Sequence, residues 1–325
     1  MTLSPSAEVV RRLVELTTRA PSMHNTQPWH WRLTEDGLEL HADRARQLRR
    51  ADPQGRNLTI SCGAALHHLQ VAAGALGWAA EVHRVPDGPA SSVLARVVLR
   101  PGTPSETADS DLRAIDDRCT DRRRFTSWPV PDDRLQHLAN TATEHGVHAI
   151  PLLAATERFR AELLVSRAVE RQAADERFMA EQQQWVDRNG AEGIPSTVLP
   201  QQLTSAAGAR PTRFSPGLLV EPEERLIEGA DGLVILCSGS DDVETWLRAG
   251  EALSALWLSA TAQGLSVVPL TQVVEVDETR EALQRDVLGG LANPLMLVRI
   301  GWQPISRSQL PRTSRRPVDD VLELA

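Results

Sequence analysis

Lysine and tyrosine are absent from this 325-residue sequence, and cysteine is scarce. All 35 basic residues are therefore arginines. Without lysine, the chain has no Schiff-base or pyridoxal-phosphate anchor and no phosphate-binding loop that ends in lysine. The three cysteines, Cys62, Cys119 and Cys237, lie far apart and are odd in number. They argue against a disulfide framework and favour a reducing, cytoplasmic compartment.

Long apolar runs and metal-ligand clusters are also missing. No stretch reaches the ~18 apolar residues of a membrane-spanning helix, so we expect no membrane partner. The adjacent His67 and His68 would point about 100° apart on a helix, and we interpret them as structural rather than as metal ligands. No metal is therefore expected. The net charge of −8 argues against nucleic acid as a partner.

The order of elements predicts an α+β protein. Apolar periodicity predicts helices over 57–76, 157–185 and 242–263, and strands over 80–85, 93–99, 233–237, 266–269 and 294–300. A Pro-, Gly- and Ser-containing linker near residues 101–109 divides the chain into an N-terminal half, 1–105, and a C-terminal half, 106–325. We expect one mixed sheet in the C-terminal half. Within that half, residues 186–218 lack periodicity and form a long excursion, functional or disordered.

An internal repeat relates residues 63–77 to residues 250–264 at a constant offset of 187. Seven of the 15 positions are identical, including the glycines at both ends. Two Ala- and Leu-rich helices would match by composition alone. We favour the alternative, a duplication that produces two homologous halves with a central helix from each on a pseudo-symmetry axis.

The segment 19–29, Arg-Ala-Pro-Ser-Met-His-Asn-Thr-Gln-Pro-Trp, connects a predicted helix to a predicted strand. Its two prolines restrict the backbone, and Ser22, Asn25 and Gln27 offer uncharged donors and acceptors. Such a loop suits a flat, uncharged ring edge. A capped helix-to-strand turn is the alternative interpretation.

Two arginine clusters lie far apart in the sequence. Residues 118–125 contain four arginines in eight positions, and residues 311–317 contain three more. Arginine binds phosphate through paired hydrogen bonds, and Thr120 adds a hydroxyl group. A solvated surface is the alternative for either cluster alone. Two clusters in an acidic protein favour one shared phosphate site.

Several motifs resemble those of a known family. The pattern Ala20-Pro-Ser-x-x-Asn-x-Gln-Pro-Trp29 resembles the signature of the FMN-dependent nitroreductase superfamily. Arg118-x-Thr-x-Arg122 resembles its phosphate motif, and residues 264–271 resemble the segment that passes the central flavin ring. Residues 298–302, followed by 314–321, resemble its C-terminal strand and phosphate-binding tail. The order and spacing are most similar to the Acg subfamily of actinobacteria, in which one chain resembles a fused nitroreductase dimer.

The resemblance implies a nitroreductase-like fold duplicated within one chain, a pseudo-dimer of two α/β sandwich halves, with FMN as the cofactor. It implies that the phosphate is held by Arg118, Thr120, Arg122 and Arg315, with Arg316 as a weaker candidate. It implies a ring site formed by Pro21, Ser22, Asn25, Gln27, Pro269, Leu270 and Thr271. The Thr271 N–H would lie near flavin N5. Because the flavin performs the chemistry, no protein acid or base is assigned.

Family enzymes transfer hydride from NAD(P)H to the flavin and then reduce nitro groups or quinones. The expected function is therefore that of an NAD(P)H-dependent oxidoreductase, with a small electron acceptor as its other partner. Because the first half keeps the ring loop and the second half the arginines, we expect one flavin per chain and a monomer. Residues 186–218 resemble the Acg lid, so an FMN-sequestering or storage protein is the alternative. A flavin-free structural protein is the third hypothesis.

Overall fold

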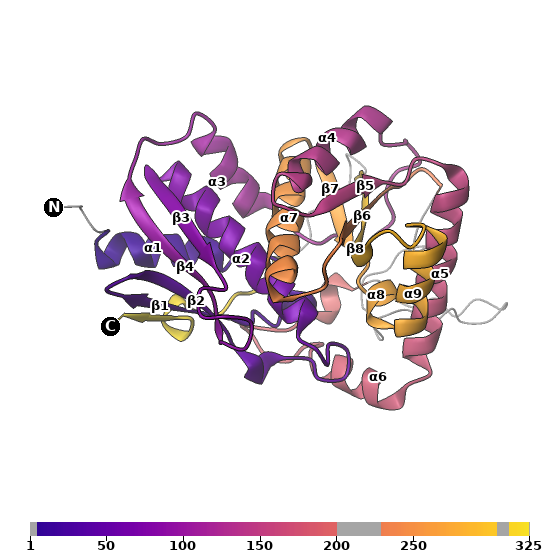
Figure 1. Ribbon diagram of the computed structural model, residues 1–325, viewed down its shortest axis with the longest axis horizontal. Coiled ribbons are helices and arrows are strands. Elements are labelled where there is room, and N and C mark those ends of the chain that lie inside the picture. Colours follow the sequence, from indigo (N-terminus) through magenta and orange to yellow (C-terminus); the bar gives the residue numbers. More distant parts are fainter. Residues whose placement is uncertain (1–4, 200–228, 304–311, 325) are drawn as a thin grey trace.

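Two β-sheets flank a central pair of helices, α2 (Arg56–Ala75) and α7 (Val243–Ala262) (Figure 1). The computed structural model describes residues 5–199, 229–303 and 312–324. Within these residues, no helix has both the length and the apolar character that crossing a bilayer requires. The predicted mixture of helices and sheets is confirmed, and the contact between the central helices joins the two sides of the molecule.

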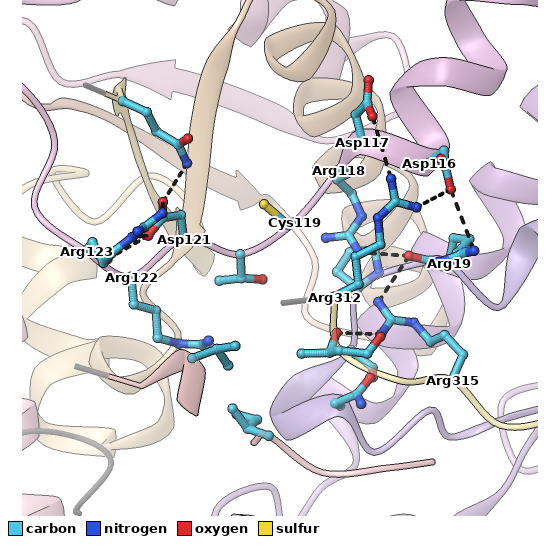
Figure 2. A pocket seen from close by; sticks show the side chains of 18 residues that line it. Arg19, Asp116, Asp117, Arg118, Cys119, Asp121, Arg122, Arg123, Arg312 and Arg315 are labelled. Atoms are coloured by element: carbon cyan, nitrogen blue, oxygen red, sulfur yellow. Dashed lines mark hydrogen bonds and ion pairs between the residues drawn. The ribbon is translucent and has the colours of Figure 1, made fainter. Parts of the chain in front are cut away.

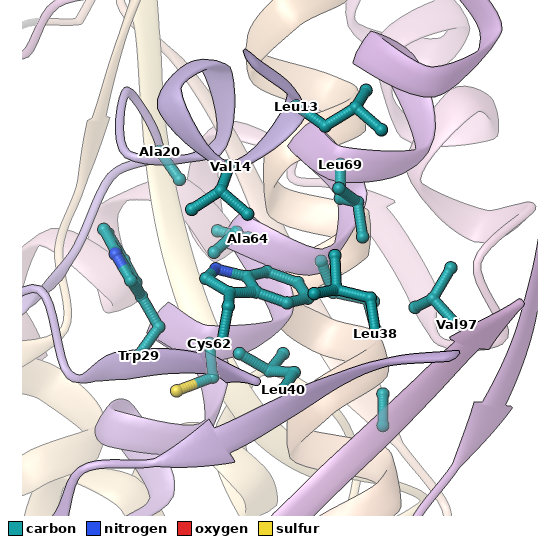
Figure 3. Close-up of a cluster of buried hydrophobic side chains, with 14 of the residues drawn as sticks. Leu13, Val14, Ala20, Trp29, Leu38, Leu40, Cys62, Ala64, Leu69 and Val97 are labelled. Carbon is teal, nitrogen blue, oxygen red and sulfur yellow. The ribbon is translucent and has the colours of Figure 1, made fainter. Parts of the chain in front are cut away.

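The first sheet has the strand order β3-β4-β2-β1-β9. Its strands are β1 (Trp29–Thr34), β2 (Gly37–Ala42), β3 (Trp78–Arg84), β4 (Val93–Pro101) and β9 (Leu322–Leu324). Trp29 and Trp31 alternate along β1 with more exposed residues and are fully buried in the first hydrophobic core, which α1 (Ala7–Thr17) and α2 cover (Figure 3). Strand β9 is parallel to β1, so the C-terminal tail returns to the first sheet.

The second sheet has the order β5-β6-β8-β7. Its strands are β5 (His148–Pro151), β6 (Gly232–Ser238), β7 (Leu265–Pro269) and β8 (Asn293–Trp302). The prediction of a mixed sheet in this half is wrong, because every pairing among these described strands is antiparallel. Strands β6 and β7 flank helix α7 and run in the same direction, but β8 lies between them.

The two sheets share a topology. The order β3-β4-β2-β1 in the first corresponds to β7-β8-β6-β5 in the second, with antiparallel neighbours in both. A register shift interrupts β2 at Leu40/His41, and another interrupts β6 at Leu236/Cys237. A tight turn joins β1 to β2, whereas a long excursion that begins with helices joins β5 to β6.

The remaining α-helices of the described chain pack against the central helices, the second sheet and one another. They are α3 (Ala108–Asp117), α4 (Asp132–Thr143), α5 (Ala155–Ala173), α6 (Glu176–Gln183), α8 (Gln272–Glu275) and α9 (Asp277–Asp286). The prediction of one helix over 157–185 is wrong. Asp175 interrupts it by accepting hydrogen bonds from the N–H groups of Arg177 and Phe178, which caps the start of α6. Of the predicted excursion 186–218, residues 200–218 lie outside the described part of the chain.

Two glycines allow the central helices to touch. A Cβ atom on Gly63 would lie 2.0 Å from the carbonyl oxygen of Leu247, and one on Gly250 would lie 2.0 Å from that of Ile60. The two contacts are equivalent under the repeat, because Gly63 and Gly250 are 187 positions apart, and so are Ile60 and Leu247. Since helices pack without spare volume here, each position requires a residue without a side chain.

We predict that Gly63→Ala destabilises the protein by about 1–3 kcal/mol or more, because the new methyl group overlaps backbone atoms of α7. The matched control is Gly74→Ala on the same helix, where a Cβ meets nothing within 4 Å. This control should be neutral or stabilising by up to ~1 kcal/mol, because alanine favours helix. Urea unfolding measures both. Equal destabilisation by the two variants would contradict the close approach.

Two buried histidines lie between the central helices. His67 Nδ1 is 2.8 Å from Ser254 Oγ, and that oxygen is 2.9 Å from His68 Nδ1, which also hydrogen-bonds to the Ala64 carbonyl oxygen. Burial lowers the pKa of His67 to about 3. Burial, reinforced by the positive charge of Arg118, lowers the pKa of His68 well below its usual value. Both side chains are therefore neutral at pH 7 and serve as buried hydrogen-bonding groups.

The lowered pKa values predict acid sensitivity. Below pH ~6.5 the unfolded chain protonates each histidine while the folded chain does not, so stability falls as the pH falls. His67→Gln should reduce the slope of unfolding free energy between pH 6 and 5 by up to about 1.4 kcal/mol per pH unit. The exposed His137→Gln is the control and should leave the slope unchanged. An unaltered slope in the His67 variant would show that this histidine protonates in the folded protein.

Candidate functional site

Two neighbouring cavities lie where the first loop, the segment after α3 and the C-terminal tail meet the central helices. The larger has a volume of about 320 Å³ and is rich in arginine, whereas the smaller has about 90 Å³. They share four lining residues, Pro21, Ser22, Thr120 and Arg122. They therefore form two parts of one site, one strongly cationic and the other walled by α2 and α7.

The loop between α1 and β1 has an unusual backbone. His24, Asn25 and Gln27 have φ angles of 49°, 55° and 49°, a left-handed region that non-glycine residues rarely adopt. The Ser22 hydroxyl stabilises the loop by accepting a hydrogen bond from the Gln27 N–H at 3.0 Å. Strain concentrated in one loop is typical of a functional site, since the fold must enforce it.

The amide side chains of this loop bind neighbouring segments. Asn25 Nδ2 donates to the carbonyl oxygens of Gly193 at 2.9 Å and Ser314 at 3.2 Å. Gln27 Oε1 accepts a hydrogen bond from the Arg316 N–H at 2.8 Å. The loop is thus fastened to the described start of the excursion and to the C-terminal tail. The Asn25 Nδ2 donor and the Gln27 Oε1 acceptor are thus engaged by the protein itself.

Two guanidinium groups converge on one backbone oxygen. Arg118 Nη2 lies 2.8 Å and Arg315 Nη2 3.4 Å from the Arg19 carbonyl oxygen. Arg118 also stacks over the Trp257 ring, 4.8 Å from its centroid. Figure 2 shows Arg118, Arg315 and Arg312 on one side of the larger cavity, with Arg122 and Arg123 on the other.

These two arginines lack a counter-charge. Within the described part of the chain, neither forms an ion pair with a carboxylate, and Arg118 Nε, Arg118 Nη1 and Arg315 Nε are buried without a hydrogen-bond partner. Burial lowers the pKa of Arg118 to about 10. Burial, together with repulsion from Arg118, lowers the pKa of Arg315 to about 9. By contrast, Arg312 on the same side of the cavity pairs with Asp116 at 2.6 Å. An anion would satisfy both groups.

Most of the predicted site residues line the two cavities. They are Pro21, Ser22, Asn25, Arg118, Thr120, Arg122, Pro269, Thr271 and Arg315. Leu270, Gln27 and Arg316 are not among the residues that line these two cavities, so their place in the cofactor site stays a prediction. Successive residues of an extended segment face opposite sides, so Leu270 packs into the core beneath β8. Gln27 and Arg316 bind each other behind the cavity wall and support the loop.

The sequence reasoning missed other lining residues. Trp257 looks like any apolar residue of a buried helix, and no sequence signal separates it from its neighbours. Arg312 belongs to the second arginine cluster, yet composition cannot show which of its members faces a cavity. Ile194 and Val198, which also line the larger cavity, belong to residues 186–218, the segment that the sequence predicts to be a lid-like excursion. Among the residues described, no group of three potential metal ligands occurs.

The chain belongs to the nitroreductase family, whose pattern it matches over residues 115–302, more than half of its length. The matched region begins within α3 and ends with β8, so it contains the arginines of the first cluster and the segment around Thr271. The family resemblance inferred from the sequence motifs is confirmed.

Relatives extend the likeness over nearly the whole chain. A Mycobacterium tuberculosis H37Rv protein named "Putative NAD(P)H nitroreductase Rv3131" is 40% identical over 98% of this chain and 92% of its own. "Putative NAD(P)H nitroreductase acg" from the same strain is 33% identical over 98% and 96%, in agreement with the Acg resemblance. The NADPH complex of the FMN-dependent nitroreductase NfnB from Mycobacterium smegmatis aligns at 17% identity over 64% of this chain and 95% of its own, with a TM-score of 0.40.

We predict that inorganic pyrophosphate raises the thermal midpoint of the protein and that Arg315→Gln removes most of this rise, because the variant loses one of the two uncompensated charges. Without the anion, the variant should be at least as stable as the parent, since like charges no longer face each other. Differential scanning fluorimetry measures both effects. Arg285→Gln, which removes an exposed arginine paired with Asp286, is the control. An equal rise in all three proteins would show that pyrophosphate acts elsewhere.

Proposed function

We propose that this protein is an NAD(P)H-dependent oxidoreductase of the nitroreductase type that binds one FMN per chain between its two halves. The observation that carries the proposal is the pair of buried guanidinium groups without a counter-charge, at one end of a site whose other end is narrow and mostly uncharged. A flat ring with a phosphate tail has this distribution of charge. The family membership supports the same cofactor.

The cationic cavity would hold the phosphate. Arg118 and Arg315 present buried N–H groups there, the Trp257 ring orients Arg118, and Thr120 lies between the two cavities. Arginine suits this role because its guanidinium stays charged when buried and donates in a planar pair. The phosphate would offset the repulsion between Arg118 and Arg315.

The smaller cavity would hold the ring. Pro21 and Ser22 line it from the first loop, and Pro269 and Thr271 line it from the end of β7. Bound FMN supplies hydride chemistry, accepting electrons from NAD(P)H and passing them to an acceptor. The chain's part is to orient the ring, to exclude water with Trp257 and neighbouring apolar groups, and to place the Thr271 N–H near N5.

The site arises from an internal duplication in our proposal. Both sheets have the same strand order, both carry a register shift in the corresponding strand, and the 187-residue offset exchanges the Gly63 and Gly250 contacts. Chance similarity of two Ala-rich helices does not account for these correspondences. A chain that contains both halves already has the interface that a dimer would supply, which favours a monomer.

Side chains occupy the position in the molecule that the duplication relates to the ring cavity. Ala64 and Trp257 line the ring cavity, and the offset of 187 relates them to Glu251 and Gln70. Gln70 Nε2 donates to Glu251 Oε1 at 2.7 Å, and Arg84 pairs with the same buried carboxylate at 2.7 Å. The fully buried Glu251 carboxylate, paired with Arg84, therefore occupies the position where the first site has space.

The second half also lacks the ring loop. The connection from α4 to β5 contains only residues 144–147, whereas residues 18–28 join α1 to β1 in the first half. Both differences support a single flavin site per chain.

The described start of the excursion favours a covered flavin. Gln27 Nε2 donates to the Ala191 carbonyl oxygen at 2.9 Å, and Arg46 forms an ion pair with Glu192. Ile194 and Val198 line the cationic cavity. This cover over the site is the one observation that favours the second candidate, an FMN-sequestering protein, in which a nicotinamide would not reach the ring.

We predict that the purified protein carries close to one FMN per chain and that NADPH or NADH bleaches its absorbance under anaerobic conditions. We expect one FMN because our proposal places a single ring cavity in the chain. We expect reduction because Pro269 and Thr271, of the segment that we propose to face the ring, line that cavity. Extracted flavin measured against protein concentration gives the stoichiometry, and stopped-flow absorbance gives the rate.

Dithionite is the control, because this small reductant does not require a nicotinamide site. If dithionite bleaches the flavin but NADPH and NADH do not, the proposal of an oxidoreductase is wrong and FMN sequestration is favoured. About two flavins per chain would contradict the filled second site, and a colourless protein that does not bind added FMN would exclude both functions.

A further inference from the structure

The ring cavity contains few groups that can exchange a proton. Its described lining comprises one face of α2, two residues of α7, the end of β7, and residues 21–24, Thr120, Arg122, Thr271 and Met296. No aspartate, glutamate or cysteine is among these lining residues. A guanidinium group keeps its proton near neutral pH. His24 is therefore the only described lining side chain whose ordinary titration lies close to pH 7.

The first loop holds His24 firmly at this wall. The residue is 4% exposed, and its backbone angles, φ 49° and ψ 23°, lie in the left-handed region. Before it, the Met23 N–H donates to Ser61 Oγ of α2 at 3.2 Å. After it, the Asn25 N–H donates to the Ser22 carbonyl oxygen at 3.1 Å. The fold thus enforces an unfavourable backbone conformation at the residue that brings an imidazole to the cavity.

The charges around this imidazole are of one sign. The described lining residues of α2, α7, β7 and β8 are uncharged, and so are Thr120 and Thr271. The one other lining side chain that carries a charge is Arg122, from the segment after α3. A protonated His24 and Arg122 would therefore both present positive charge to the cavity. Such an arrangement suits a reaction in which negative charge develops on the bound molecule.

Reduction of a quinone requires a proton as well as electrons. The quinone takes one hydride, which carries both electrons and which bound FMN supplies, and one proton, and it becomes a hydroquinone with an O–H bond at each oxygen. The imidazolium of His24 can provide the proton: its N–H bond breaks, the electron pair stays on the ring nitrogen, and the neutral imidazole regains a proton from solvent before the next turnover.

We propose that His24 is the proton donor to a quinone acceptor in the ring cavity. The proposal rests on the proposed function and deepens it, because it assigns a protein acid to the second half-reaction. A buried side chain is needed for this step, since a ring cavity closed by Trp257 and apolar groups keeps bulk water from the acceptor.

The test compares two oxidants of the flavin-loaded full chain after its reduction by one equivalent of dithionite. Benzoquinone requires a proton, whereas ferricyanide takes single electrons and no proton. In stopped-flow experiments, the parent rate with benzoquinone should fall as the pH rises through the titration of His24. His24→Asn should lower this rate at pH 6 about tenfold or more and remove that pH dependence, and it should leave the ferricyanide rate unchanged.

Asparagine is chosen because it tolerates the left-handed backbone and cannot act as an acid. The matched control is Met23→Leu, which alters the neighbouring lining residue and should keep the pH dependence. Equal losses with both oxidants in the His24 variant would show a structural role and overturn the proposal. A parent rate with benzoquinone that does not change with pH would overturn it without any variant.

A second measurement does not depend on turnover. In the flavin-loaded protein labelled with ¹⁵N-histidine, NMR should show a His24 signal, identified by its absence from the variant, whose titration midpoint equals that of the benzoquinone rate. A His24 signal that does not titrate between about pH 5 and 9 would contradict proton donation. Failure of the proposed function is distinguishable, because it would appear as a protein that binds no flavin.

Discussion

The repulsion between two buried guanidinium groups is the constraint on which the architecture of the site depends. Arg118 and Arg315 meet at the Arg19 carbonyl oxygen although 197 positions separate them in the chain. Bringing them together requires the C-terminal tail to leave the second sheet and pair with β1. Asn25 secures the tail by donating to the Ser314 carbonyl oxygen. The fold thus brings two positive charges together at an electrostatic cost that an anionic ligand would offset, in agreement with the proposed phosphate site.

The contact between the central helices underlies our proposal of one flavin site in a chain whose two sheets share a strand order. Close contact at Gly63 and Gly250 fixes the separation of α2 and α7, so side chains on either side of the contact decide whether space remains. Ala64 leaves space beside Trp257, whereas Glu251, at the related position, fills it together with Arg84. Without Arg84, the fully buried carboxylate of Glu251 would lose its charged partner, which is costly.

Local features of the chain allowed much of the fold and site to be predicted, and tertiary partners account for the errors. The loop around Ser22 and the arginines from Arg118 onward lie in short segments whose composition is unusual, so the sequence alone identified them as candidates, and they line the same two cavities. The break before α6 depends on one side chain, the Asp175 carboxylate that caps the helix. The spacing of apolar residues continues across this position and does not predict the break. Leu270 and Gln27 lie between true lining residues, and only the packing of their neighbours shows that they face away. The sheet prediction failed because strands that are adjacent in sequence need not be adjacent in space.

The absence of lysine acquires a physical meaning at this site. A buried ammonium group readily loses its proton, whereas a guanidinium group remains charged at neutral pH even when burial lowers its pKa. Many other arginines, such as Arg312 and Arg84, have carboxylate partners, and these pairs are compatible with a net charge of −8. Arg118 and Arg315 differ from them by having none within the described residues. In an acidic protein rich in ion pairs, buried positive charges that have no carboxylate partner among the described residues indicate a candidate anion site more specifically than the number of arginines does.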